Sequence, residues 1–452
     1  MKRQWKSTLA LICCFVLLAT LLSACKTKKN EVTVTYNPNY AGATSTTEKV
    51  TKGTTVVPPI LSRQGFNLEG WCRDADGVQP IAATGFKVSS DITFYAKWTA
   101  LPKDDGDDNK GDDNKGNDNN GEEVKVADMS IHFMELGNNS NGDSIYIKAG
   151  DTDILIDAGS STGSAATIEK YVDQYCTDGK LEYVIATHGD TDHIAAFVGT
   201  TKIPGIFDYY ECETIIDFAR SGKNTTTLNN YYAKRDAEVA AGAKHYTALD
   251  CVKEQNGAKK VYDIADGITM EILYQKYYES STSNENDYSV CVLFTQGDNH
   301  YLFLGDLEEA GEKSLVENNN LPEVELYKAG HHGSKTSANE LLLSIIKPKV
   351  VCISCVAGHT EYTQEFENTF PTQDFINRIA PYTDKVYVTT EGKLKYNEST
   401  DRWNSDGYLS MNGNIVFSCI DGVIEVHGTN NDILLKDTEW FAANRTCPQA
   451  WA

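Results

Sequence analysis

The densest group of potential metal ligands lies in Thr187-His-Gly-Asp-Thr-Asp-His193, directly after the largely apolar run Tyr183-Val-Ile-Ala-Thr187. Four imidazole or carboxylate side chains fall within six residues there. Alternate residues of an extended loop can point the same way, so His188 and Asp190 can share one metal ion, while Asp192 and His193 can face a second. Imidazole and carboxylate ligands together suit divalent cations. A polar loop whose aspartates cap a helix is the alternative, and the number of ligands favours the metal site.

Two later segments also end in carboxylate or imidazole side chains. Tyr301-Leu-Phe-Leu-Gly-Asp306 is expected to be a strand that ends in a carboxylate. The segment that begins at Glu325 is expected to be a strand that leads into His331-His332-Gly-Ser. Gly330 and Gly333 would allow another part of the backbone to approach closely. Four of the nine histidines therefore fall in loops that can meet at one sheet end.

The elements that must position these loops have α/β character over about residues 126–399. Residues 144–148 and 153–157 alternate as paired strands around the turn Ala-Gly-Asp-Thr-Asp. Residues 165–175 carry apolar side chains at helical spacing, and further strands and helices follow to about residue 389. Residues 400–452 are expected to be a C-terminal β extension, with a hairpin over 413–427 and no evident chemistry.

This central region resembles the metallo-β-lactamase superfamily, specifically the branch fused to competence (DNA-uptake, ComEC-type) proteins. The shared motifs are Gly142-Asp-Ser-Ile, Ile154-Leu-Ile-Asp157-Ala-Gly159, the run 187–193, Leu304-Gly-Asp306-Leu-Glu308 and the run 328–337. They occur in the family's order across about 200 residues. The resemblance implies an αββα sandwich and a metal-dependent hydrolase.

The resemblance also implies roles for individual residues. Asp157 would support the metal loop, Asp306 would bridge two divalent ions, and either His331 or His332 would complete a ligand shell. The ligand and catalytic set then comprises His188, Asp190, Asp192, His193, Asp306, His331 and His332, with Asp192 also catalytic. Asp190 stands where the wider superfamily has histidine, which tilts the site toward manganese or an oxygen-rich zinc environment. Ser334 and Lys335 would hold a substrate oxyanion, with Lys335 as a second catalytic residue.

Two features of the family are absent. A Gly-His-Pro that follows the last core strand aligns with Thr369-Phe370-Pro371, and His359 is a possible replacement for its histidine. The superfamily's separate histidine before the bridging aspartate is also missing, and Asn286 and Asp287 occupy roughly that place. The metal ion bound by His188 and Asp190 would therefore be held loosely.

The N-terminus reads as a lipoprotein signal over residues 1–24. Three basic residues precede an apolar run that is too short for an ordinary membrane span, and Leu22-Ser-Ala-Cys25 matches a lipobox. Cys25 would be lipidated and would hold the protein on the extracellular face of a bacterial membrane. An ordinary secretory signal with a chance cysteine is the alternative.

Two further segments separate the signal from the central domain. Residues 31–99 resemble the Listeria–Bacteroides (internalin-type) repeat through Gly65-Phe-Asn-Leu-Glu-Gly70-Trp71 and Asp91-Ile-Thr-Phe-Tyr-Ala-Lys-Trp98, which implies a small surface-exposed β module with a cell-wall or surface partner. Residues 100–125 are rich in Asp, Asn, Gly and Lys and are expected to be an extended acidic linker. The pair Cys352 and Cys355 lies in an apolar run and is expected in a buried strand.

Three functions are compatible with these features. The first is a metal-dependent phosphodiesterase acting outside the cytoplasm, with nucleic acid as one substrate. The second is the same chemistry on a phosphorylcholine or cell-wall phosphodiester, which the net charge of −23 favours over long DNA. The third is a surface adhesion protein whose hydrolase domain is vestigial. Nothing indicates hydrolysis of β-lactams, because a superfamily fold does not fix a substrate.

Overall fold

The computed structural model describes residues 31–40, 43–56, 58–59, 63, 66–78, 81, 86–100 and 126–452. The chain divides into two compact units, one up to Asn119 and one from Asn120 to Ala452. The predicted signal segment, Cys25 and nearly all of the acidic linker lie outside the described residues. No helix within the described ranges is both long and apolar enough to cross a membrane.

The first unit is a small β module, as the sequence predicts. Its four-stranded sheet has the order β2-β1-β6-β4, and a two-stranded sheet pairs β3 with β5. Val34, Phe94 and Trp71 are buried, because alternate residues of the strands face one side. The strands are β1 (Glu31–Asn37), β2 (Thr46–Thr51), β3 (Thr55–Val56), β4 (Phe66–Cys72), β5 (Phe86–Lys87) and β6 (Ile92–Ala100).

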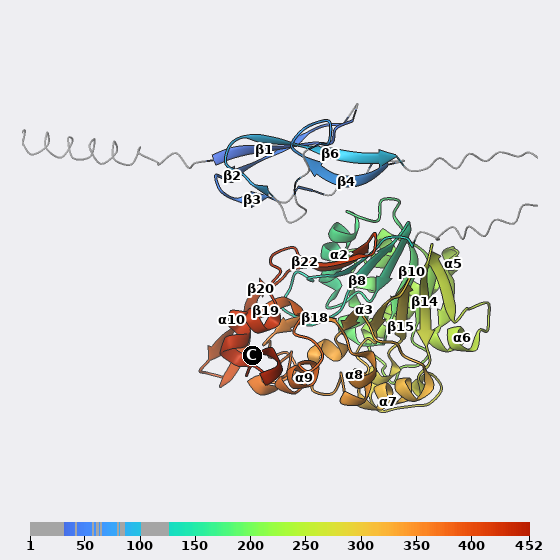
Figure 1. The fold of residues 1–452 in the computed structure, drawn as a ribbon. Helices are drawn as coiled ribbons and strands as arrows, with labels where there is room; N and C mark the ends of the chain where they lie inside the picture. Colours follow the sequence, from blue (N-terminus) through green and yellow to red (C-terminus); the bar gives the residue numbers. More distant parts are fainter. Residues whose placement is uncertain are drawn as a thin grey trace, which may run out of the picture. The chain divides into compact units, whose positions relative to one another are not determined.

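The second unit contains two eight-stranded sheets (Figure 1). The first has the order β12-β11-β10-β9-β8-β7-β21-β22. The hairpin predicted around residues 144–157 is confirmed, since β8 and β9 pair antiparallel with Ile147 opposite Ile154. Its strands are β7 (Met129–Phe133), β8 (Ile145–Ala149), β9 (Thr152–Ile156), β10 (Lys180–Ala186), β11 (Glu211–Asp217), β12 (Lys244–Thr247), β21 (Ile415–Ile420) and β22 (Val423–Gly428).

The second sheet has the order β13-β14-β15-β16-β17-β18-β19-β20. Cys352 and Cys355 lie on β18, which is buried along its length, as expected for a core strand. The strands are β13 (Val261–Ala265), β14 (Ile268–Leu273), β15 (Cys291–Gln296), β16 (Asn299–Phe303), β17 (Leu326–Lys328), β18 (Val350–Ala357), β19 (Val386–Asn397) and β20 (Arg402–Ser410).

Helices cover the outer faces of both sheets, which gives the predicted αββα arrangement. Figure 1 shows α7, α8 and α9 along one outer side of this unit and α2 on the opposite side. One apolar core packs the first sheet against α2, α3 and strands of the second sheet, and a second core packs the second sheet against α7, α8 and α9. The α-helices are α2 (Ala165–Val172), α3 (Thr191–Val198), α4 (Ile206–Tyr209), α5 (Thr226–Ala241), α6 (Ala248–Lys253), α7 (Glu309–Asn318), α8 (Glu340–Ile346), α9 (Gln373–Ile379) and α10 (Glu439–Asn444).

Short 3₁₀ turns link these elements, and the C-terminal residues join both sheets. β20 pairs with β19 in the second sheet, while β21 pairs with β7 in the first. Residues 400–452 thus belong to the same compact unit as residues 126–399, and the domain boundary at residue 399 stays a prediction. The 3₁₀ turns are η1 (Thr162–Ser164), η2 (Lys276–Tyr278), η3 (Glu285–Tyr288), η4 (Gly330–Gly333), η5 (Phe366–Asn368), η6 (Leu435–Asp437) and η7 (Gln449–Trp451).

Candidate metal centre

The ligand-rich run after β10 is only partly a loop. The strand ends at Ala186, Asp190 is the residue before the helix, and α3 begins at Thr191. Asp192 and His193 therefore lie in the first helical turn, and the expectation of a loop throughout is wrong. The reason is that Asp190 has an extended backbone that lets the helix start one residue later.

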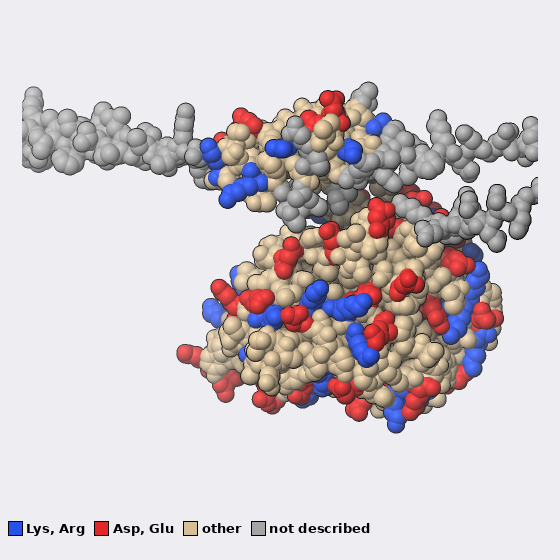
Figure 2. All heavy atoms as spheres, viewed as in Figure 1, with Lys and Arg blue, Asp and Glu red and all other residues tan. Residues whose placement is uncertain are grey.

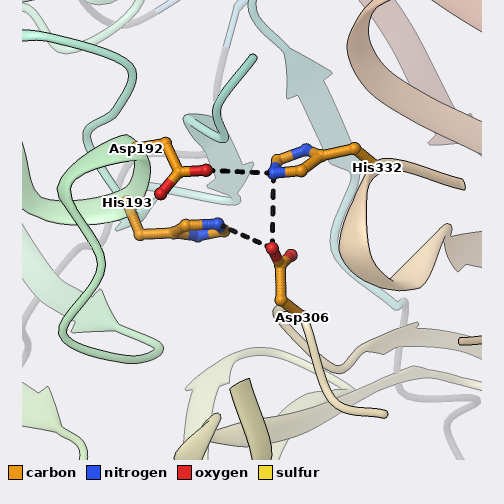
Figure 3. Close-up of side chains that lie close together, drawn as sticks. All are labelled: Asp192, His193, Asp306 and His332. Carbon is orange, nitrogen blue, oxygen red and sulfur yellow. Dashed lines mark ion pairs between the residues drawn. The ribbon is translucent and has the colours of Figure 1, made fainter. Parts of the chain in front are cut away.

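Four side chains from three segments of the chain converge on one point (Figure 3). Asp192 and His193 come from α3, Asp306 follows β16, and His332 lies in η4 after β17. Nε2 of His193 is 3.2 Å and Nε2 of His332 is 3.3 Å from Oδ2 of Asp306. Nε2 of His332 is also 3.5 Å from Oδ2 of Asp192. One donor atom from each residue lies within 4.8 Å of the others, so the group is dense enough to surround one cation.

Glycine lets the first turn of α3 reach this position. A Cβ on Gly159 would lie 1.5 Å from the carbonyl oxygen of Asp192, so no other residue fits there. The backbone N–H of Ala158 donates to the carbonyl of His193 at 2.8 Å. The motif Asp157-Ala-Gly159 therefore fixes the start of α3 against the end of β9.

Asp157 lies where a supporting residue is expected. It is buried, and its Oδ2 accepts a hydrogen bond from Nδ1 of His193 at 2.8 Å. Its carboxylate also accepts from the backbone and the hydroxyl of Thr187, both at 2.7 Å. These contacts orient the His193 ring and leave its Nε2 free to face Asp306.

His332 is oriented in the same way by a carbonyl group. Its Nδ1 lies 2.8 Å from the backbone oxygen of Ser354, which can only accept, so Nδ1 carries the proton. Its Nε2 is then the atom that faces Asp306. Both His331 and His332 have positive φ angles, 44° and 55°, which is a costly backbone for a non-glycine residue. The sequence left open whether His331 or His332 is the ligand, and in the structure it is His332 that lies in the group.

Lys328 and Asp143 are buried beside the group, and the sequence did not predict them as site residues. Nζ of Lys328 contacts a carboxylate oxygen of Asp143 and lies 3.3 Å from Oδ1 of Asp306. Lys328 also donates to the carbonyl of Gly305 at 2.9 Å. Each lies within a motif that resembles the family, but 185 positions separate them, so nothing local in the sequence indicates that the two side chains meet. Lys328 offsets part of the negative charge and leaves Oδ2 of Asp306 directed at the two imidazoles.

The local field favours positive charge on the imidazoles. Burial alone lowers the pKa of His332, but Asp306 and Asp143 overcome this effect and raise it to about 10. Burial raises the pKa of Asp306, yet His332, His193 and Lys328 together hold it well below its ordinary value. A field that holds a proton on these rings also favours a metal cation at the same atoms.

Buried ring nitrogens without hydrogen-bond partners also indicate that a divalent metal ion fits the site. Nε2 of His188, His193 and His332 are buried, and none has a hydrogen-bond partner of acceptable geometry. Buried polar atoms are rarely left unsatisfied, so these nitrogens call for a ligand. Three imidazole nitrogens with several carboxylate oxygens suit zinc or manganese, and the expectation of two ions stays a prediction.

His188 and Asp190 form a separate, looser pair. Nε2 of His188 lies 3.8 Å from Oδ2 of Asp190, while Oδ1 of Asp190 contacts Nζ of Lys223. Burial and the neighbouring His193 hold the pKa of His188 well below its usual value, so the ring is neutral and its Nε2 can act as a ligand. These two residues lie beside the main group without belonging to it, since no group of three or more donors among the described residues includes them.

Other predicted residues lie outside the group. Nδ1 of His331 is 3.0 Å from Oε1 of Glu308. Lys335 is exposed and donates to Asn368 at 2.8 Å, and the hydroxyl of Ser334 pairs with that of Thr336 at 2.9 Å. His359, the possible replacement ligand, lies beside Glu361 at 3.8 Å and is absent from the donor groups found among the described residues.

Aromatic side chains line the rim on the side of the missing Gly-His-Pro histidine. The ring of Phe370 lies 5.5 Å from that of His331 and 6.0 Å from that of His332. Tyr362 packs against Phe370 at 5.8 Å, and its hydroxyl donates to Oδ2 of Asp192 at 2.8 Å. Tyr362 is 56% exposed, so its ring is open to a substrate while its hydroxyl holds a ligand. An aromatic residue 170 positions after Asp192 carries no local signal that would have singled it out.

Family models match two parts of the chain. Residues 33–97 match the Listeria-Bacteroides repeat domain, and residues 137–211 match the metallo-beta-lactamase superfamily. The second match contains Asp143, Asp157 and the 187–193 run. Both resemblances inferred from the motifs are confirmed.

Two relatives are similar to part of the chain. The chain is 32% identical over 122 residues to Recombination protein 2 of Haemophilus influenzae, which is 27% of this chain and 14% of that protein. It is 25% identical over 178 residues to ComE operon protein 3 of Bacillus subtilis, 39% of this chain and 20% of that protein. The chain therefore spans a fifth or less of either relative.

Solved structures give more distant similarities. The metallo-beta-lactamase fold protein YhfI from Bacillus subtilis is 11% identical, with a TM-score of 0.33, covering 58% of this chain and 96% of that one. A putative metal-dependent hydrolase from Parabacteroides distasonis is 14% identical, with a TM-score of 0.26, covering 50% of this chain and 80% of that one.

Proposed function

We propose that this chain, which carries a metallo-beta-lactamase superfamily domain after a Listeria-Bacteroides repeat, is a metal-dependent phosphodiesterase that acts outside the cytoplasm. The observation that carries the proposal is the group of Asp192, His193, Asp306 and His332, whose donor atoms lie within 4.8 Å of one another. When bound there, a divalent ion supplies Lewis acidity toward a phosphoryl oxygen and the attacking water.

The chain's own residues have distinct parts in this chemistry. Asp157 and the carbonyl of Ser354 orient the His193 and His332 rings so that both Nε2 atoms meet at Asp306. Lys328 neutralises one oxygen of Asp306 and keeps the other available. The hydroxyl of Tyr362 fixes the orientation of Asp192. Such preorganised contacts reduce the rearrangement that the reaction requires.

Nucleic acid is the first substrate class that we propose. The sequence similarity to Recombination protein 2 and ComE operon protein 3, whose names refer to recombination and competence, supports it. Figure 2 shows acidic and basic side chains interspersed over the visible face of the larger unit. With a net charge of −23, we expect nucleic acid to be held mainly at the metal centre, by short contacts to phosphate.

The test uses the full chain with zinc or manganese and three substrates: bis(p-nitrophenyl) phosphate, single-stranded DNA and duplex DNA. We expect metal-dependent hydrolysis that Asp306→Asn lowers at least about 100-fold, since a central ligand is lost. Asp298→Asn, which changes an exposed aspartate in the turn between β15 and β16, is the matched control and should retain the rate. A wild-type rate in Asp306→Asn would refute the proposal.

A phosphorylcholine or cell-wall phosphodiester is the second candidate, and the exposed Tyr362 ring favours it. A quaternary ammonium group is attracted to the face of an aromatic ring. Release of choline from a phosphorylcholine ester, abolished by Tyr362→Ala but only lowered by Tyr362→Phe, which keeps the ring and loses the hydroxyl that holds Asp192, would favour this substrate. Release of nucleotides only, with no choline, would exclude it.

The location of the protein is proposed from the lipobox around Cys25. Diacylation there would anchor the chain to the outer face of the membrane, where the repeat module could contact a cell-wall or surface partner. We expect Cys25→Ala to move the protein out of the membrane fraction. An unchanged membrane fraction in this variant would contradict the lipid anchor.

A further inference from the structure

The metal centre has two unequal halves. The first half consists of Asp192, His193, Asp306 and His332, whose donor atoms already lie close enough to enclose a cation. The second half consists of His188 and Asp190, whose nearest donor atoms are 3.8 Å apart. No third donor completes that half among the residues that the structure describes.

A lysine occupies the second half. Nζ of Lys223 contacts Oδ1 of Asp190. The side chain of Asp190 is only 20% exposed, so an uncompensated charge there would be costly. The ammonium group already balances this carboxylate, and a metal ion approaching it must overcome repulsion from the lysine.

The backbone that carries Lys223 is fixed rather than free to move away. Glu285, itself about nine-tenths buried, accepts from the backbone N–H of Gly222 at 2.8 Å and from the hydroxyl of Ser221. A Cβ on Gly189 would lie 2.8 Å from Oε1 of Glu285. The metal-binding run and the segment before Lys223 therefore pack around the same buried carboxylate, which places the lysine beside Asp190.

The two residues that stand roughly where the superfamily has a separate histidine, Asn286 and Asp287, do not fill the gap. Asn286 donates to Glu308 at 2.9 Å, and Asp287 belongs to no donor group found among the described residues. Neither side chain supplies an anionic oxygen to a cation at His188 and Asp190.

We propose that the centre holds one metal ion tightly, at Asp192, His193, Asp306 and His332, and that the ammonium group of Lys223 takes the place of a second cation beside Asp190. This inference rests on the proposed metal centre and narrows the expectation of two ions. Lys223 is thus a positioning residue that sets the number of metal ions. Its side chain is 40% exposed, so it can also face a phosphate group of the substrate.

The test measures zinc and manganese binding to the full chain by calorimetry, together with elemental analysis after desalting. We expect one tight equivalent in the wild type and a second, far weaker one. In Lys223→Met the second equivalent should bind at least about tenfold more tightly, because a contacting positive charge is gone. Lys223→Arg should behave like the wild type.

Two further variants make the result specific. Lys234→Met removes a lysine of similar exposure that pairs with Asp208, away from the centre, and should leave both binding steps unchanged. The double variant Lys223→Met, Asp190→Asn should lose the gained second equivalent. Circular dichroism of each variant establishes that it is folded.

The outcomes separate the inference from the proposed function. Two equivalents of similar affinity in the wild type, or an unchanged second equivalent in folded Lys223→Met, would overturn the role of Lys223 while leaving a metal hydrolase in place. A wild type that binds neither metal would overturn both. One tight equivalent, with a strengthened second in Lys223→Met alone, supports the inference.

Discussion

Asp157 and His193 form a buried pair in which Oδ2 of the aspartate accepts a hydrogen bond from Nδ1 of the histidine at 2.8 Å. The opposite ring nitrogen then lies 3.2 Å from Asp306. The aspartate therefore sets which nitrogen of His193 is presented to a metal ion, although it does not belong to the ligand group itself.

Replacing Asp157 with Asn should weaken metal binding by about 10- to 100-fold, because the support of a ligand is lost while the ligand remains. A chelator competition assay with zinc measures the affinity. Asp153→Asn changes another buried aspartate, four residues away, which pairs with Lys148 and should leave the affinity unchanged. Equal losses in the two variants would indicate general destabilisation instead of a specific effect.

Lys328 should be important for folding as well as for the site. Lys328→Met leaves Asp143 and Asp306 buried without their shared cation and should cost about 3–5 kcal/mol of unfolding free energy. Urea denaturation in the presence of a chelator measures the loss. Lys349→Met, which breaks an exposed pair with Glu325, should change the stability by only about 0.5 kcal/mol. A similarly small effect in Lys328→Met would contradict the role assigned to this lysine.

The buried His132 should make the unfolding free energy of the larger unit fall at acidic pH. Burial lowers its pKa from 6.5 to about 3, because the ring is enclosed by β7 and the tyrosines of α2 and β8. The unfolded chain then binds more protons than the folded chain between these values. The contribution to stability is complete above about pH 6.5 and is lost as the pH falls, by up to about 1.4 kcal/mol per pH unit.

We therefore expect His132→Gln to flatten the decline in unfolding free energy between pH 6.5 and pH 4. Urea denaturation of both proteins in chelator at several pH values measures the difference. His427→Gln, at a half-exposed histidine on β22, is the matched control for loss of an imidazole. Parallel curves for wild type and His132→Gln would show that this histidine does not contribute.

Much of the fold could be predicted from local patterns. The alternation around residues 144–157 with its tight turn specified the β8–β9 hairpin, which the structure confirms. The start of α3 was missed, because an aspartate before a helix can be read equally as a metal ligand in a loop. The partners of β20 and β21 were not predictable either, since alternation identifies a strand but not the sheet that it joins.

In the candidate site, too, local sequence patterns identified the ligands but not the contacts between distant segments. Asp192, His193 and His332 could be proposed because each lies beside other ligand-type residues, and Asp306 because it ends an expected strand within a motif that resembles the family. Lys223 could not, because its meeting with Asp190 depends on how the segment after β11 packs around Glu285. Contacts that depend on three separate elements leave no periodic signal in a single sequence.

The most direct test of the central claim is the metal content of the purified full chain, compared with those of His332→Asn and His331→Asn. The two histidines are adjacent, but only His332 faces Asp306, while His331 pairs with Glu308. We predict one tightly held equivalent of zinc or manganese in the wild type and in His331→Asn, and its loss in His332→Asn. A wild type that holds neither metal, or a loss of metal in His331→Asn with retention in His332→Asn, would contradict the account.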